Sequence, residues 1–135
     1  MFLLDTNIIS ETRKPRPNPG LSRWIAEASP LDLYISVLSV GEIRKGVEKL
    51  RQHNARNASE IEEWLTDIED AFAERVLPID RRIAHAWGRL SARAGEHPVD
   101  VMLASTAQVH DLTLVTRNVR DVAELGIAML NPFSA

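Results

Sequence analysis

Cysteine is absent from this chain of 135 residues. Its absence excludes disulfide bonds, zinc sites built from thiolates and cysteine nucleophiles, and it is compatible with the reducing cytoplasm in which we expect the protein to act. Long hydrophobic runs are also missing, because Asp5 interrupts the apolar run at the N-terminus. We therefore expect neither a signal peptide nor a membrane-spanning helix.

The chain also lacks a strong excess of charge of one sign, with a formal net charge of -3. This balance disfavours a polybasic protein that binds a phosphate backbone tightly and nonspecifically. It does not exclude a nuclease, because carboxylates that hold a cation make the overall charge misleading. No glycine-rich phosphate loop or dinucleotide fingerprint is present, which disfavours enzymes that use nucleotide cofactors.

What the sequence does contain is typical of one globular domain, with 44% hydrophobic and 26% charged residues, and we expect a single domain over residues 1–135. Short apolar segments alternate with amphipathic ones. We expect strands at the opening residues and at 31–37, 76–79, 112–115 and 127–130, and helices at 8–12, 21–28, from 39 onward, 61–72, 81–90, 98–110 and 118–125. The polar stretch 53–60 is expected to separate two helices. This alternation predicts an α/β fold with a mostly parallel sheet covered by helices on both faces.

Four acidic residues occupy positions where an α/β fold binds ligands, which is the carboxyl edge of the sheet. Asp5 directly follows the first strand, and Glu42 lies near the start of the helix after the second. Asp121 lies in the first turn of the short helix after the fourth strand, and Asp100 opens the helix before that strand. We expect all four to face one end of the sheet.

Asp100 is the only charged residue between Pro98 and Val109. A helix that is apolar on nearly all sides is expected to be buried. A buried, unpaired carboxylate costs several kcal/mol or becomes neutral, unless a cation or a cationic partner compensates it.

The same acids also have structural explanations. Ser39 and Glu42 have the spacing of a capping box, and so do Asn118 and Asp121. The helix dipole favours an acid at the position of Asp100. Taken singly, each acid is better explained in this way, so the functional interpretation rests on the set.

Asp80 provides a comparison, because it also follows a strand and opens a helix, and we interpret it as a cap only. The four histidines lack metal-ligand spacing and are expected to be surface or satisfied residues; they are His53, His85, His97 and His110.

Three or four carboxylates that converge on one point repel one another unless a cation is present. Ligand sets made only of oxygen select hard ions, so we expect Mg²⁺ or Mn²⁺ rather than zinc or copper. Without a Ser–His pair or a cysteine nucleophile, such a site is suited to phosphodiester hydrolysis by metal-activated water.

The residues also resemble a known family along nearly the full length of the chain. The matching segments, in order, are LLDTNIISE, ISVLSVGEIRKGVEKL, LPIDRRIAHAWGRL, PVDVMLASTAQVHDLTLVTRNVRDV and LNPF. Together they resemble PIN-domain ribonucleases, in particular the VapC-type toxins of bacterial toxin–antitoxin pairs. The resemblance implies a three-layer α/β/α sandwich around a mostly parallel sheet.

The resemblance also implies a set of metal-binding acids. Asp5, Glu42 and Asp100 match the acidic positions of the family, with Asp5 and Asp100 expected to contact the metal directly. Many members have an acid where this chain has Asn118, and Asp121 is then the acid that completes the site. Glu42 and Asp121 are expected to act directly or through water.

Three further positions bear on this expected site. Asn7 and Thr116 match polar family positions near the metal and are expected to orient ligands or water. Val122 stands where the family has Phe or a similar residue, a change expected to affect packing rather than chemistry.

The implied function is an Mg²⁺- or Mn²⁺-dependent endoribonuclease that forms a homodimer and is restrained by a cognate antitoxin protein. Operator DNA would be bound only through the antitoxin. Some members of the family cut specific tRNAs, but no residue here selects such a substrate.

Two alternatives remain open at this point. One is a PIN-fold binding module with weak or no catalysis, which the Asn118 position favours. The other is an aspartate-based phosphatase resembling haloacid dehalogenases, which would need a second acid at the position of Asn7.

Overall fold

The computed structural model describes residues 1–93 and 97–134, apart from the side chains of Asp121 and Val122. The strands are β1 Phe2–Leu4, β2 Leu33–Ser36, β3 Val76–Leu77, β4 Thr113–Val115 and β5 Met129–Leu130. The helices are α1 Thr6–Thr12, α2 Pro19–Glu27, α3 Val37–Arg51, α4 Ala55–Phe72, α5 Arg81–Ser91, α6 Pro98–His110 and α7 Val119–Val122. Short 3₁₀ helices span Pro30–Asp32, Ala73–Arg75 and Ala123–Leu125. Among the described residues, no helix is long and apolar enough to cross a membrane.

The five strands form one sheet in the order β3-β2-β1-β4-β5, and every neighbouring pair is parallel. The central strand β1 aligns Leu3 with Tyr34 of β2 and with Leu114 of β4. Because all strands run the same way, their carboxyl ends lie along one edge of the sheet. The expected parallel sheet is confirmed.

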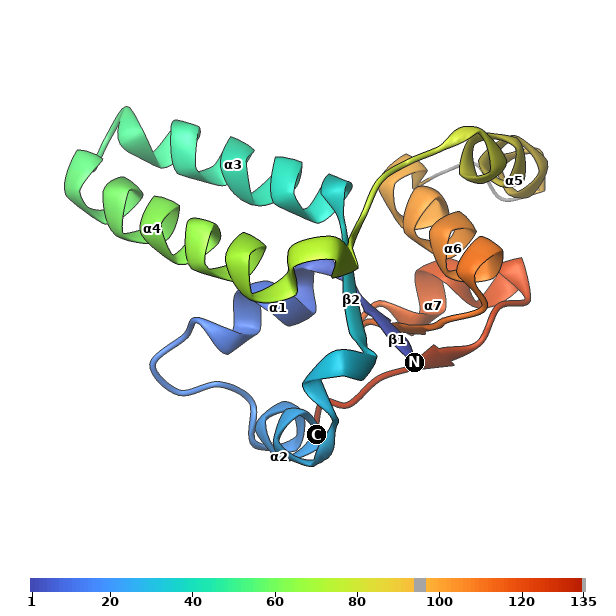
Figure 1. Ribbon diagram of the computed structural model, residues 1–135, viewed down its shortest axis with the longest axis horizontal. Coiled ribbons are helices and arrows are strands. Elements are labelled where there is room, and N and C mark those ends of the chain that lie inside the picture. Colours follow the sequence, from blue (N-terminus) through green and yellow to red (C-terminus); the bar gives the residue numbers. More distant parts are fainter. Residues whose placement is uncertain (94–96, 135) are drawn as a thin grey trace.

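Helices cover both faces of this sheet, as Figure 1 shows. Successive residues of β1 point to opposite faces, as the two-residue period of a strand requires. Leu4 packs in a core that also contains Ile8, Val47 and Leu65, from α1, α3 and α4. Leu3 packs in a second core with residues of α5 and α6, among them Leu90 and Leu103. The architecture is therefore a three-layer α/β/α sandwich.

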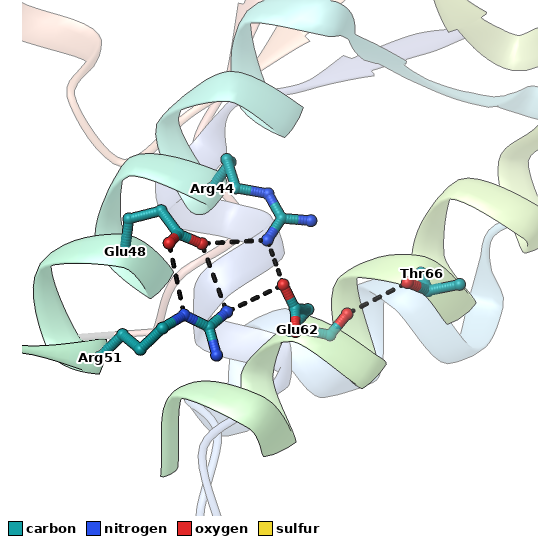
Figure 2. A network of polar contacts seen from close by, with 5 residues as sticks. All are labelled: Arg44, Glu48, Arg51, Glu62 and Thr66. Atoms are coloured by element: carbon teal, nitrogen blue, oxygen red, sulfur yellow. Dashed lines mark hydrogen bonds and ion pairs between the residues drawn. The ribbon is translucent and has the colours of Figure 1, made fainter. Parts of the chain in front are cut away.

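Helices α3 and α4 form a long hairpin that extends from the left side of the molecule in Figure 1. Four charged side chains join the two helices, as Figure 2 shows. Arg51 Nη2 lies 2.9 Å from Glu62 Oε2, which also pairs with Arg44, and both arginines pair with Glu48. The arginines hold the pKa of Glu62 below its usual value. All four side chains are partly exposed, so the network orders the hairpin more than it stabilises the fold.

The first four helices begin before their expected starts, α1, α2 and α3 by two residues each and α4 by six. Helix α4 begins at Ala55, so most of the polar stretch 53–60 is helical. The side chain of Asn54 caps this helix by accepting a hydrogen bond from Asn57 N, and Ala58 is fully buried. Helix α3 begins at Val37, and its N-cap is Ser36, three residues before the expected N-cap Ser39.

Candidate functional site

Three of the four predicted acids line one pocket. Asp5, Glu42 and Asp100 surround a pocket of about 300 Å³ at the carboxyl edge of the sheet. Its other lining residues are Thr6, Asn7, Ser10, Val99 and Asn118. Asp5 follows β1, Glu42 comes from α3 after β2, and Asp100 comes from the first turn of α6. The topology thus brings together residues that are far apart in sequence.

Asp5 is the buried carboxylate of this pocket, with 6% of its surface exposed. Thr116, which follows the neighbouring strand β4, donates a hydrogen bond of 2.7 Å from Oγ1 to Asp5 Oδ2. Burial raises the pKa of Asp5, and the Thr116 bond and the backbone amides of Thr6 and Asn7 oppose this rise less strongly. A cation in the pocket would favour the charged carboxylate.

Asn7 presents a buried amide oxygen to the same region. Asn7 Oδ1 has no hydrogen-bond partner among the described residues, although it is fully shielded from solvent. An unsatisfied buried acceptor costs about 1–3 kcal/mol. Its position beside Asp5, in the lining of the pocket, makes a bound cation or an ordered water its natural partner.

Glu42 is held by a residue that the sequence did not single out. Thr6 Oγ1 donates to Glu42 Oε1 over 2.5 Å, and it also lies 2.8 Å from Ser39 Oγ. A hydroxyl carries one proton, so when Thr6 donates to the carboxylate, Ser39 is the donor in the other contact. Ser39 and Glu42 of α3 are thus both joined to Thr6 of α1, and Ser39 is completely buried.

The capping-box explanation of Glu42 is wrong. Ser36, not Ser39, is the N-cap of α3, and its hydroxyl accepts a hydrogen bond from Leu38 N. Glu42 therefore lies in the second turn, beyond the reach of a capping box. Asp80, in contrast, is confirmed as a cap, because its Oδ1 accepts a hydrogen bond of 2.9 Å from Ile83 N.

Asp100 is less buried than its apolar helix suggested. The buried residues of α6 begin at Val101 and continue through Ala107, whereas Asp100 is partly exposed in the first turn. The reason is its place at the end of the helix, where α6 opens onto the pocket. The free-energy cost of burying a carboxylate without a compensating cation, which we expected for Asp100, therefore applies to Asp5.

The fourth position contains Asn118, which lines the pocket. Its backbone N–H donates to Thr116 Oγ1 over 3.0 Å, so Thr116 links Asn118 to Asp5. The side chain of Asn118 makes no capping bond to α7, although it occupies the N-cap position. Asp121 belongs to α7, but its side chain lies outside the described part of the structure, so its role stays a prediction.

The donor set suits a hard divalent cation that retains water. Among the side chains described, no three histidine, cysteine, aspartate or glutamate residues are close enough to bind one ion together. Mg²⁺ is usually held by one or two carboxylates and keeps several waters, so this spacing is compatible with it. The buried Asp5 and the unsatisfied Asn7 oxygen fit such an ion.

Comparison with known proteins identifies the family. Residues 2–126 match the PIN domain. Toxin FitB of Neisseria gonorrhoeae is 33% identical over 138 residues, which cover 98% of this chain and 99% of FitB. VapC ribonuclease Y4jK of Sinorhizobium fredii is 29% identical, with 98% of each chain covered.

Solved structures agree with these relatives. The crystal structure of FitAcB from Neisseria gonorrhoeae has a TM-score of 0.88 at 33% identity, with 98% of each chain covered. The structure of FitAB bound to an IR36 DNA fragment has a TM-score of 0.91 at 31% identity, with 100% of this chain and 97% of the other covered. A toxin–antitoxin complex from Klebsiella pneumoniae shares the fold, with a TM-score of 0.72 at 23% identity over the whole of both chains. The chain therefore belongs to the PIN-domain family, and its relatives include VapC-type ribonucleases and toxin FitB.

Proposed function

We propose that this protein is a divalent-metal-dependent endoribonuclease and the toxin of a toxin–antitoxin pair. The observation that carries the proposal is one pocket lined by Asp5, Asn7, Glu42 and Asp100, in which Asp5 is a buried carboxylate and Asn7 has an unsatisfied amide oxygen. The names of the relatives, a toxin and a VapC ribonuclease, support the substrate class and the biological role.

Each residue of the pocket has a distinct part in this proposal. Asp5 and Asp100 would hold Mg²⁺ or Mn²⁺, and Thr116 fixes the orientation of Asp5 through its hydroxyl. The bound ion would supply an activated water and neutralise charge on the phosphate. Glu42, held by Thr6, would contact the ion directly or through water, and Asn7 would orient ligands or water near Asp5.

Asn118 and Asp121 complete the proposed site. Asn118 contributes a neutral amide where many members of the family have an acid, so it brings no negative charge to the ion. We assign to Asp121 the negative charge that Asn118 lacks, and Asp121 would contact the ion directly or through water.

The proposed partners follow from the relatives. A cognate antitoxin would restrain the enzyme, in line with the toxin name of FitB and the toxin–antitoxin complex that shares the fold. The protein is proposed to be a homodimer and to reach operator DNA only through its antitoxin, a view that the DNA-bound FitAB complex supports.

The test is RNA cleavage by the antitoxin-free protein during Mg²⁺ and Mn²⁺ titrations, with EDTA and single-stranded DNA as controls. Asp5→Asn and Asp100→Asn are expected to abolish cleavage without unfolding the protein. Asp80→Asn is the matched control, because asparagine also caps helices and Asp80 does not line the pocket. Cleavage that survives EDTA, or Asp5→Asn protein that cuts RNA as fast as wild type, would contradict the proposal.

A second function is favoured by Asn118 alone. If the missing charge at that position prevents metal binding, the protein is a binding module of the same fold. It would then bind RNA in EDTA but show no cleavage at any Mn²⁺ concentration. The phosphatase alternative is disfavoured, because such chemistry uses a second acid two residues after the nucleophilic aspartate, and Asn7 occupies that position after Asp5.

A further inference from the structure

The charged residues of helix α5 are all basic. Residues 81–93 contain four arginines and one histidine but no acid, in a chain whose net charge is -3. The helix buries Ile83 and its equivalents one and two turns on, Ala86 and Leu90. Arg82, His85 and Arg89 are exposed on another face, at the i, i+3, i+7 spacing that aligns side chains along a helix. We call these three residues the α5 basic face.

The α5 basic face lines a shallow, open depression. Arg82, His85 and Arg89 line a space of about 420 Å³ together with Val109, in the last turn of α6. Arg82 Nη2 donates to the carbonyl oxygen of Val109 over 3.4 Å, a long contact that leaves the other guanidinium donors available. None of the three basic residues forms an ion pair with any residue that the structure describes.

Three basic side chains outside α5 are neutralised by ion pairs. Lys14 pairs with Glu11 over 2.8 Å, and Arg44 and Arg51 pair with glutamates in the network of Figure 2. Helix α4 has one arginine and six acids, so the α3–α4 hairpin as a whole is acidic. A polyanion would be repelled by that hairpin and by the carboxylates of the catalytic pocket. It needs a cationic surface elsewhere.

We propose that the α5 basic face binds the phosphate backbone of the RNA substrate, away from the bond that is cut. The inference rests on the proposed ribonuclease function and adds a second contact region to it. Guanidinium groups bind phosphate through paired hydrogen bonds, and Arg82 and Arg89 present two of them on one face. Contacts to phosphates position a nucleic acid without reading its sequence, so this face sets affinity rather than the cleavage site.

The geometry gives the length of RNA that can use this face. Val109 lies at the end of α6 and Asp100 at its beginning. Nine residues separate these two positions, which corresponds to about 14 Å along the helix. At about 3.4 Å per nucleotide of a helical strand, an RNA that contacts both regions needs roughly four nucleotides. Shorter substrates reach the catalytic pocket without touching the α5 basic face.

The first experiment measures binding in EDTA, so that its outcome does not depend on cleavage. Labelled RNAs of about 20 and about two nucleotides are titrated with wild-type protein and with Arg82→Gln/Arg89→Gln over a salt series. The double variant is expected to bind the long RNA more weakly, with the slope of log Kd against log salt reduced by about 1.4 for two lost contacts. Binding of the short RNA is expected to be unchanged.

Lys49→Gln/Arg56→Gln is the matched control, because it removes two exposed positive charges from the far end of the α3–α4 hairpin. An equal loss of affinity in this control, or a wild-type slope in the α5 variant, would overturn the inference. A change in the oligomeric state of the α5 variant in size-exclusion chromatography would also overturn it, because the face would then be a protein interface.

The second experiment separates this inference from the proposed function. With Mg²⁺ or Mn²⁺ present, the α5 variant is expected to show a raised KM and an unchanged kcat for the long RNA, and neither change for the short one. If wild-type protein binds RNA through α5 but never cleaves it, the ribonuclease proposal fails and the α5 inference stands. If wild-type protein and the α5 variant both cleave the long RNA with the same KM, only the α5 inference fails.

Discussion

Replacing Asp5 by asparagine is expected to stabilise the metal-free protein while removing its response to metal. Asp5 is 6% exposed, and burial raises its pKa in the folded state. The protonated form therefore stabilises the fold below the ordinary carboxyl pKa, and this contribution is lost as the pH rises through the folded pKa. At neutral pH the charged carboxylate lowers the free energy of unfolding of the metal-free protein, and the neutral asparagine side chain does not.

The response to metal has a calculable size. A ligand at a hundred times its Kd stabilises the folded state by about 2.7 kcal/mol. Unfolding entropy of about 2.1 cal/mol/K per residue amounts to about 0.28 kcal/mol/K for this chain of 135 residues. Saturating Mg²⁺ or Mn²⁺ is therefore expected to raise the Tm of wild-type protein by about 10 °C, and to leave the Tm of Asp5→Asn nearly unchanged.

Thermal melts in EDTA and in saturating Mn²⁺, at neutral pH and near pH 4, provide the assay. In EDTA at neutral pH, Asp5→Asn is expected to melt above wild type, and the difference is expected to shrink toward pH 4 because folded Asp5 becomes protonated. Asp80→Asn controls for the substitution itself and is expected to keep the full metal shift. If Asp5→Asn melts below wild type in EDTA, the burial argument is wrong. If Asp5→Asn keeps the rise in Tm that metal causes in wild type, the assigned metal site is wrong.

Three further predictions concern two residues of this pocket and the helix cap Asp80. Thr6→Val is expected to lower the cleavage rate about fivefold, from the loss of about 1 kcal/mol of hydrogen bonding to Glu42, and Thr6→Ser is expected to restore it in the same kinetic assay. Asn118→Asp is expected to bind Mn²⁺ more tightly in calorimetry and to melt lower in EDTA, because it adds a negative charge to the pocket. Asp80→Ala is expected to cost about 1 kcal/mol of stability through loss of the cap, with cleavage unchanged.

Most elements of the fold were predictable because their sequence signals are local. Helix α6 begins at Pro98 and ends at His110, as expected, since a proline at the first position and a long apolar run define it. The start of α4 was not predictable in this way. Its first turns are mostly exposed and polar, so the apolar period that reveals a helix begins only at Ile61, and Asn54 caps a helix whose first residues give no such signal.

The gathering of Asp5 and Glu42 was predictable from topology, because the parallel strands deliver their following residues to one edge. Asp100 follows no strand, since α6 comes after α5, and only its place as the lone acid of an apolar helix drew attention to it. The contacts that orient these acids were not predictable. Thr6 meets Glu42 across 36 positions of sequence, and this depends on how closely α1 approaches α3. No spacing rule within either helix encodes that approach. Their catalytic roles remain predictions for the experiments above.

Hydrogen-bond partners separate the structural acid from those of the pocket. Asp80 accepts from an amide of the helix that it begins, so its carboxylate stabilises its own local structure. Asp5 also precedes a helix, but its side-chain partner is Thr116, 111 positions away, and it makes no capping bond to α1. A buried carboxylate with a raised pKa and no capping role destabilises the metal-free fold at neutral pH. A cation in the pocket would offset this cost, and a cation or an ordered water would also give the unsatisfied oxygen of Asn7 a partner.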